Sequence, residues 1–218
     1  MINGRIVAGG LRADLPAGAS DPWYARLVIA SSRPRLSFEE YCQIEAASSV
    51  RHEFWDGQVW AMAGGSREHA ALAANVVALL ATALRGGRCQ VHTSDLRIRV
   101  PATGLTTYPD VSVICGRAEL DPEDRLGHTV TNPILLVEVL SPSTEQYDRS
   151  EKLPQYQRIE SLRTVVLIGH SEQVIEVWQR PNGGEWILST HRTGLVELPS
   201  IAATLPVSEV YRDPLAGP

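Results

Sequence analysis

Glu138 is the one charged residue in a run of otherwise apolar side chains, Ile134 to Leu140, which is typical of a fully buried strand. An ionised carboxylate that stands alone in an apolar interior costs of the order of several kcal/mol. It therefore normally shifts its pKa, gains a partner or binds a metal ion. A functional site is best sought around this residue.

Asp110 is the natural companion of Glu138. It lies at the beginning of a second strand, "YPDVSVICG", whereas Glu138 lies near the end of its own. If the two strands are antiparallel neighbours, both carboxylates meet at one edge of the sheet, where they repel each other unless a proton or a cation lies between them. Oxygen ligands suit Mg²⁺, which takes one or two carboxylates and keeps several waters. The pair therefore predicts a Mg²⁺ site, with a backbone carbonyl next to Glu138 as a further ligand.

Lys152 is the candidate for a positive charge at this site, because only a short turn separates it from the Glu138 strand. A divalent ion polarises a phosphoryl oxygen and lowers the pKa of attacking water, and a nearby lysine stabilises the charge that develops. Asp110, Glu138 and Lys152 together indicate chemistry on a phosphate ester.

Each of these residues also has a plainer interpretation. Asp110 can be a solvent-facing carboxylate or a cap. Glu138 can form a structural ion pair with an arginine such as Arg97. Lys152 lies four residues after Asp148, so these two can form an ordinary helical salt bridge. The residues alone leave these alternatives open.

The histidines and the common motifs point to no other enzyme class. The six histidines show no spacing typical of a zinc hydrolase, and the chain has no P-loop, no dinucleotide-binding glycine motif and no serine-hydrolase elbow. His69, beside Glu68 in the first turns of an expected helix, is as readily an ordinary helix residue as a functional one.

Composition indicates an ordinary globular protein. Of the 218 residues, 44% are hydrophobic and 21% charged, and the net charge of −5 argues mildly against non-specific binding to nucleic acid. No apolar run approaches the roughly 20 residues of a membrane helix, and the N-terminus makes a poor signal peptide. Cys42, Cys89 and Cys115 are odd in number and form no CxxC pair, so we expect reduced thiols in the cytoplasm and no cysteine-based zinc site.

One folded domain with two extensions is expected. Residues 1–34 are rich in Gly, Ala, Arg and Pro and are predicted to be a flexible arm, residues 35–213 the domain, and residues 214–218 a tail. Within the domain, Ser37 and Glu40 form the capping box of a helix, and Asp56-Gly57 turns a hairpin.

A longer helix is expected from Ser66 to Gly86, packed into the body of the protein because apolar residues lie nearly all round it. Strands are expected at "CQVHTSDLRIRV", "YPDVSVICG", "PILLVEVL", "RTVVLIG", "QVIEVWQR" and "EWILSTHR", the last two joined by a turn at 182–184. The segment around Lys152 is helical in character but contains Pro154, which either interrupts a helix or begins one. The pattern predicts a mixed α/β fold.

Several separate motifs resemble, in the same order, those of the Uma2 (DUF820) family, which is placed among the PD-(D/E)XK restriction-endonuclease-like nucleases. The resemblance covers residues 37 to 213 and rests on "EFWDGQVWAMAGGSREH", "SDLRIRVP", "YPDVSVIC", "PILLVEVLSPST", "YDRSEKLPQY" and "LPSIAATLPVSEVY". It implies a restriction-endonuclease-like core, with a central mixed β-sheet flanked by helices, an extra N-terminal helix and hairpin, and extra C-terminal strands.

By this resemblance, Asp110 ends the "PD" motif and Glu138 is the acidic residue of "(D/E)XK". The position of the motif lysine holds Leu140; in relatives of this kind the lysine can move to the following helix, where Lys152 stands. His69 looks like part of the site region. The residues expected to assist from nearby are Glu53, Asp95 and Asp148.

The resemblance implies an endonuclease, a hydrolase that cleaves phosphodiester bonds with Mg²⁺ or Mn²⁺, and DNA is the expected substrate. Asp110 and Glu138 would bind the metal, Lys152 would stabilise the developing charge, and His69 would assist. A homo-oligomer, and first of all a dimer, is expected because two sites cut both strands of a duplex most simply. The alternative is a non-catalytic member that binds nucleic acid or protein, which Leu140 and the acidic charge favour.

Overall fold

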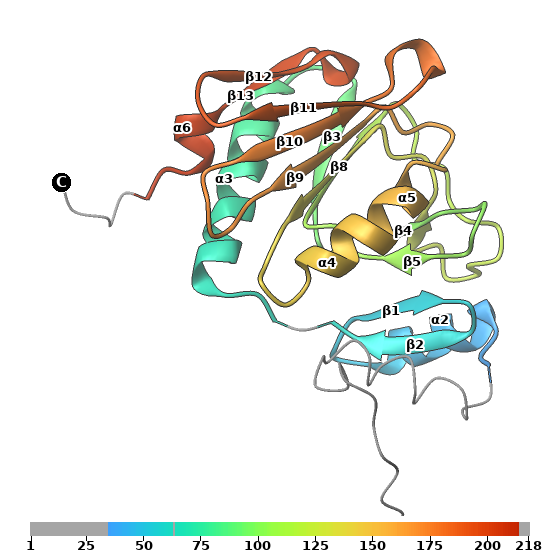
Figure 1. The fold of residues 1–218 in the computed structure, drawn as a ribbon. Coiled ribbons are helices and arrows are strands. Elements are labelled where there is room, and N and C mark those ends of the chain that lie inside the picture. Colours follow the sequence, from blue (N-terminus) through green and yellow to red (C-terminus); the bar gives the residue numbers. More distant parts are fainter. Residues whose placement is uncertain (1–34, 63, 214–218) are drawn as a thin grey trace, which may run out of the picture. The chain divides into compact units, whose positions relative to one another are not determined.

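The computed structural model describes residues 35–62 and 64–213, and the chain divides into two units, residues 1–35 and 36–218. The expected flexible arm, residues 1–34, and the expected tail, residues 214–218, lie outside the described residues. The second unit contains a six-stranded sheet, a five-stranded sheet and a two-stranded sheet, with helices against them (Figure 1). This confirms the predicted mixture of sheets and flanking helices.

The six-stranded sheet carries the apolar run that holds Glu138. Its strand order is β11-β10-β9-β8-β6-β3. The strands are β3 (Cys89–Thr93), β6 (Val111–Cys115), β8 (Leu135–Val139), β9 (Thr164–Ile168), β10 (Ile175–Gln179) and β11 (Ile187–His191). β8 and β9 are parallel and the other neighbours antiparallel, so the sheet is mixed. Val111 of β6 faces Val137 of β8 in an antiparallel pair, which confirms the arrangement predicted for the Asp110 and Glu138 strands.

The two faces of this sheet bury two different cores. On one face, Val137 and Val139 belong to a core with α3, α6 and the β12–β13 pair. On the other face, Leu136 and Leu140 belong to a core with the helical segment 145–156 and the five-stranded sheet. Because side chains alternate along a strand, Glu138 faces the helical segment, where it contacts Lys152 and Tyr156. The elements of the first core are α3 (Arg67–Ala83), β12 (Leu195–Leu198), β13 (Ala203–Pro206) and α6 (Val207–Val210), with the short 3₁₀ turn Pro199–Ile201 between the two strands.

The five-stranded sheet contains the hairpin that the sequence predicted. Its order is β2-β1-β5-β4-β7, formed by β1 (His52–Trp55), β2 (Gln58–Ala61), β4 (Arg97–Arg99), β5 (Thr106–Thr107) and β7 (Thr129–Val130). Asp56 and Gly57 turn the hairpin with positive φ angles of 49° and 76°, which glycine adopts without strain. The helix α2 (Phe38–Ala47) begins at Ser37 with the predicted capping box.

The long helix α3 begins where predicted, since Ser66 Oγ accepts a hydrogen bond from the His69 amide, but it ends at Ala83. The expectation that it is packed into the body of the protein holds for one side of the helix only. Leu72, Val76 and Leu80, spaced four residues apart, are buried in the core, whereas the other residues of the helix are partly or fully exposed. In the described part of the chain, no helix combines the length and apolar character needed to cross a bilayer.

The segment from Cys89 to Val100, predicted as one strand, is two strands in different sheets. A turn at residues 94–95 separates β3 from β4, and the amide of Leu96 donates to the carbonyl of Thr93. The alternation of apolar and polar residues changes phase at the turn. Four polar residues, 92–95, separate Val91 from Leu96, and this interruption is the sequence signal of the turn. The predicted turn between β10 and β11 is confirmed, as a 3₁₀ turn at Pro181–Gly183.

The expectation of three reduced thiols is wrong for two cysteines. Cys89 of β3 and Cys115 of β6 are cross-strand partners and form a disulfide, whereas Cys42 is free and buried in α2. The cysteines are 26 residues apart, and only the register of the β3–β6 pair brings them together.

The helical segment 145–156 runs through Pro154 without a break. It comprises α4 (Glu145–Tyr147), a π-helical turn (Asp148–Lys152) and α5 (Leu153–Tyr156). In the π turn the Leu153 amide donates to the carbonyl of Asp148, five residues back. Single π turns of this kind are frequent at functional sites, and this one carries Lys152.

Candidate active site

Glu138 is buried, but it has partners. Its side chain is 6% exposed. The Tyr156 hydroxyl donates a hydrogen bond of 2.5 Å to Glu138 Oε1, and the Lys152 ammonium donates one of 3.4 Å to the same oxygen. The helical segment 145–156 thus supplies both groups that hold the carboxylate in the apolar run.

Lys152 lies at the centre of a buried charge cluster, which consists of Glu53, Glu138, Asp148, Lys152 and Tyr156. Its Nζ lies 2.8 Å from Glu53 Oε1, 3.3 Å from Asp148 Oδ1 and 3.4 Å from Glu138 Oε1. The expected i,i+4 contact with Asp148 is therefore present. It is one of three and lies inside the protein, since the Lys152 side chain is only 8% exposed.

Glu53 enters the cluster from the predicted hairpin. Its Oε2 accepts a 2.9 Å hydrogen bond from the indole of Trp60, its cross-strand partner, and its Oε1 accepts a 2.5 Å bond from the Thr107 hydroxyl. The carboxylate of Glu53 is fixed from both strands that flank β1. It serves as a rigid partner for the ammonium of Lys152.

The cluster contains more negative than positive charge, because three carboxyl groups surround one ammonium. Burial raises the pKa of Glu138 to about 8; Lys152 opposes this rise, and Asp148 and Asp110 add to it. Burial also raises the pKa of Asp148. The pKa of Lys152 is held well above its usual value, because the surrounding carboxylates outweigh the effect of burial. Such a site gains from a proton or from a further cation.

Asp110 and His69 form a second, more exposed pair at the same edge of the sheet. Asp110 Oδ2 accepts a 2.7 Å hydrogen bond from the amide of Val139, next to Glu138, and lies 3.2 Å from His69 Nε2. The hydrogen bond with Asp110 raises the pKa of His69, although burial opposes it. The structure therefore brings together Asp110, Glu138 and His69 from three separate parts of the sequence.

The loop before α3 fits closely around His69. A Cβ atom at Gly65 would lie 2.8 Å from His69 Nδ1, which is too close for any side chain without movement of the ring. Gly65 therefore permits the approach of the loop to the histidine, and Ser66 then caps the helix that carries it.

A cleft of about 860 Å³ opens beside Asp110 and His69. Its other lining residues come from residues 49–51, from Met62, Gly64 and Gly65, from the alanine-rich side of α3 and from the end of β3 at Thr93 and Ser94. The side chains of Asp110 and His69 are 16% and 18% exposed, so they can meet a molecule in the cleft.

The carboxylates suit a hard divalent cation. Among residues 35–62 and 64–213, no three His, Cys, Asp or Glu side chains are arranged to hold a metal ion, which argues against a zinc centre. Mg²⁺ needs only one or two carboxylates besides water, and Mn²⁺ has similar preferences. Among the contacts of the described residues, those of Glu138 involve Oε1 and those of Asp110 involve Oδ2, so a cation can approach the carboxylates from their second oxygens. The excess of buried negative charge fits the same role.

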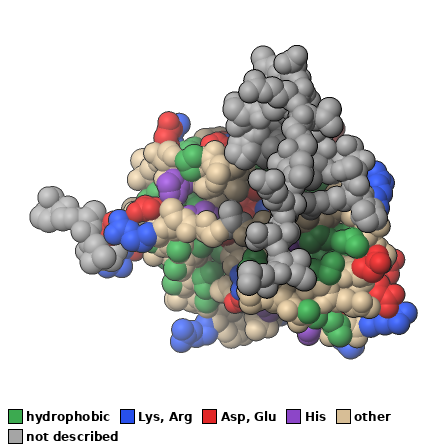
Figure 2. Space-filling view, turned by 90° about the horizontal axis from the view of Figure 1, so that it is seen from below, with side chains coloured by type: hydrophobic (Ala, Val, Ile, Leu, Met, Phe, Trp, Pro, Cys, Tyr) green, Lys and Arg blue, Asp and Glu red, His purple; other side chains and the backbone are tan. Residues whose placement is uncertain are grey.

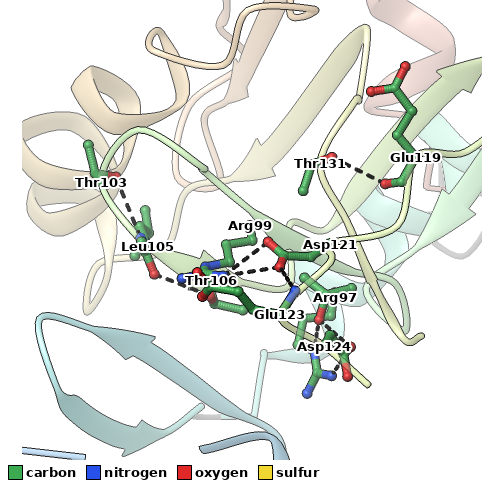
Figure 3. Close-up of polar contacts among 12 residues, drawn as sticks. Arg97, Arg99, Thr103, Leu105, Thr106, Glu119, Asp121, Glu123, Asp124 and Thr131 are labelled. Carbon is green, nitrogen blue, oxygen red and sulfur yellow. Dashed lines mark hydrogen bonds and ion pairs between the residues drawn. The ribbon is translucent and has the colours of Figure 1, made fainter. Parts of the chain in front are cut away.

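Arg97 is not the partner of Glu138, whose ion pair is with Lys152 instead. Its guanidinium lies 2.8 Å from Asp124 Oδ2 and donates to Thr129 Oγ1 over 2.7 Å, and neighbouring Arg99 binds Asp121 and Glu123 (Figure 3). These pairs fasten β4 to the loop at 121–124. Arg97 is already committed to a structural role.

Asp95 does not join the buried cluster. It lies in the exposed turn between β3 and β4, where it contacts Arg51 and the Thr93 hydroxyl. Tyr156 and Thr107, in contrast, belong to the site and were not predicted. A hydroxyl is an ordinary residue in a helix or strand, and only the three-dimensional fold shows that these two reach carboxylates.

The structure places carboxylates and a lysine at one edge of a mixed sheet. The fold resembles the crystal structure of a "putative nuclease belonging to DUF820" from Anabaena variabilis ATCC 29413, with a TM-score of 0.60 and 19% identity. The match covers 75% of this chain and 91% of that one.

Residues 38–208 match the model of the Uma2 family, described as "Putative restriction endonuclease", and the chain belongs to this family. Two proteins of Synechocystis sp. PCC 6803 are similar to it. The uncharacterised protein slr1290 is 39% identical over 181 residues, which cover 82% of this chain and 93% of that protein. The uncharacterised protein sll1609 is 28% identical over 163 residues, which cover 75% and 91%.

Proposed function

We propose that this protein is a metal-dependent endonuclease that hydrolyses phosphodiester bonds of DNA, with Mg²⁺ or Mn²⁺ as cofactor. The observation that carries the proposal is the contact of Lys152 with Glu138 at the sheet edge where Asp110 lies. Family and fold support the nuclease class. The metal and the substrate are inferred from the chemistry of the side chains.

Asp110 and Glu138 are the residues that would hold the divalent ion, together with a backbone carbonyl next to Glu138. Such an ion, when bound, polarises a phosphoryl oxygen and lowers the pKa of the attacking water. The Val139 amide and His69 fix Asp110, while Tyr156 and Lys152 fix Glu138.

Lys152 and His69 supply positive charge from two sides of the carboxylates. Lys152 stabilises the ionised, metal-binding form of Glu138. Its own positive charge also stabilises the negative charge that develops on the phosphate in the transition state. His69, whose pKa is raised, faces the cleft, where its ring can donate a proton to a phosphate oxygen. A preorganised group of this kind typically contributes about 10²–10³-fold to a rate.

A second candidate function is a binding protein that keeps the fold without catalysis. Lys152 is enclosed by three carboxylates, and Leu140 lies in the core at the position of the motif lysine. Among the described side chains visible in Figure 2, the basic and acidic ones are scattered and do not gather into one basic surface. Both features are compatible with a partner other than duplex DNA.

Cleavage of plasmid DNA separates the two candidates. The wild type should nick or linearise the plasmid in Mg²⁺ or Mn²⁺, and cleavage should stop with a chelator or with Glu138→Gln. Ca²⁺ should bind without supporting the reaction well. A wild type that binds DNA but leaves it intact under every metal condition would establish the binding protein, and a matched RNA substrate identifies the preferred nucleic acid.

Thermal unfolding tests the metal site without reference to activity. Millimolar Mg²⁺ should raise the melting temperature of the wild type by mass action and should leave Asp110→Asn unchanged. An equal shift in both proteins would place the bound ion elsewhere. We further propose a dimer, which light scattering of the purified protein tests directly.

A further inference from the structure

A second, smaller hollow adjoins the cleft of the candidate active site. It has a volume of about 300 Å³ and shares the wall formed by Ser49, Val50 and Arg51 with the larger cleft. Tyr108, two residues before Asp110, also lines it. A linear substrate that lies in the larger cleft beside Asp110 can therefore continue over this wall into the second hollow.

Arg51 is the cation of the shared wall. Among the described residues that line the larger cleft, it is the only arginine or lysine. Its guanidinium reaches from the segment before β1 to the β3–β4 turn, where it contacts Asp95 and Ser94. It also lies 5.7 Å from the centre of the Tyr108 ring, which is held in place by a 2.7 Å hydrogen bond from its hydroxyl to Glu45.

The contact of Arg51 with Asp95 is of a kind that a phosphate can replace. The two side chains are 44% and 74% exposed, and ion pairs between exposed side chains contribute little to stability. A phosphate offers an arginine two charge-assisted hydrogen bonds in a matching geometry. Exchange of Asp95 for a phosphate therefore costs the folded protein little and gains a contact to substrate.

We propose that Arg51 binds a backbone phosphate next to the scissile phosphodiester, that Asp95 holds the guanidinium ready when no substrate is present, and that the strand continues from the larger cleft across Arg51 into the second hollow. This inference rests on the proposed nuclease function and adds to it the residue that holds the strand. In this proposal Asp95 is not part of the catalytic cluster. Its carboxylate competes with the substrate phosphate for the Arg51 guanidinium.

Binding of a fluorescently labelled DNA duplex in Ca²⁺, measured over a series of KCl concentrations, tests the proposal. Arg51→Ala should weaken binding about 10-fold or more and lower the slope of log Kd against log salt by about one, as expected for one lost phosphate contact. Asp95→Asn should tighten binding a few-fold, because the competing carboxylate is removed. The melting temperatures of both variants should stay close to that of the wild type.

Arg192 and Glu172 provide matched controls. They form an exposed ion pair of 3.2 Å, with side chains 63% and 68% exposed, and line neither hollow. Arg192→Ala and Glu172→Gln repeat the charge changes of Arg51→Ala and Asp95→Asn, so they report the general effect of net charge. The proposal requires that the Arg51 and Asp95 variants depart from these controls in opposite directions.

Two results overturn the proposal in distinguishable ways. If the wild type cleaves DNA but Arg51→Ala binds like Arg192→Ala, or if Asp95→Asn weakens binding, Arg51 does not hold the strand and the nuclease function stands. If the wild type neither binds nor cleaves nucleic acid, the proposed function fails and the role of Arg51 fails with it.

Discussion

The Lys152 ammonium lies 3.4 Å from Glu138 Oε1, although fourteen residues separate the two in the chain. The motif position two residues after Glu138 holds Leu140, a residue that is 2% exposed and part of the apolar core. The lysine that meets the carboxylate comes instead from the π turn of the following helical segment. A change in local helix geometry thus brings a cation to the place where the strand itself has none.

Glu138→Gln should leave the metal-free protein as stable as the wild type, or more stable, while abolishing cleavage. The pKa of this carboxyl group is raised to about 8 in the folded state, whereas an unfolded glutamate titrates near about 4.3. Between these values the folded state binds the extra proton, so the stability of the wild type falls as the pH rises. Chemical denaturation in a chelator, at about pH 5 and about pH 8, measures the difference, which should grow with pH in favour of the variant. A loss of about 3–5 kcal/mol would instead mark Glu138 as one half of a structural ion pair.

Tyr156→Phe should reduce cleavage about 10-fold without abolishing it. The hydroxyl donates a 2.5 Å hydrogen bond to Glu138 Oε1, and its loss frees the carboxylate to rotate. Loss of a hydrogen bond to a charged group also costs about 1.5–3 kcal/mol of stability. Tyr41→Phe is the control, because Tyr41 is fully buried and its hydroxyl binds the backbone of His52 rather than the cluster. Equal rates for these two variants would show that Tyr156 only supports the fold.

Asp124→Asn should remove a part of the stability that the wild type loses in acid. Burial alone would raise the pKa of Asp124, but the hydrogen bonds from Thr129 and Arg97 outweigh burial and lower the pKa to about 2. A carboxyl group with a lowered folded pKa stabilises the protein above its unfolded pKa of about 3.9, and this contribution disappears as the pH falls toward about 2. Unfolding free energies measured from pH 7 to pH 2 should therefore differ by at least about 2 kcal/mol at neutral pH and converge in acid. A constant difference would contradict the account.

Thiol titration should find one reactive cysteine in the protein unfolded without reductant, since Cys89 and Cys115 are paired and Cys42 is free. In the chain-entropy model, a disulfide that closes a loop of this length contributes about 3.5 kcal/mol. Unfolding with and without a reductant should therefore differ by about this amount. Three titratable thiols in the unreduced protein would show that the pair stays reduced.

The meeting of Asp110 and Glu138 at one edge of the sheet was predictable from the sequence, because it follows from the geometry of antiparallel strands. Asp110 begins one strand and Glu138 ends its antiparallel neighbour, so the two must meet at one edge. The hairpin at Asp56-Gly57 and the helix caps at Ser37 and Ser66 were also predictable, because each depends only on residues close together in the chain.

The partners of the cluster depend on long-range packing and were less accessible. Tyr156 reaches Glu138 because the helical segment 145–156 continues through Pro154, a residue that from the sequence either interrupts a helix or begins one. Cys89 meets Cys115 through the register of one strand pair. Neither relationship leaves a periodic signal, since both depend on which elements lie side by side.

The most direct test of the account is the single-turnover cleavage rate of Lys152→Met in Mg²⁺, with DNA saturated by enzyme. The account predicts a rate about 10²-fold or more below that of the wild type, with DNA affinity in Ca²⁺ unchanged because the lysine acts on the transition state. Lys152→Arg should restore little, since a planar guanidinium does not replace a compact ammonium among three carboxylates. Folded Lys152→Met protein that cleaves at the wild-type rate would contradict the assignment of Lys152, and with it the central claim that the buried cluster is the catalytic centre.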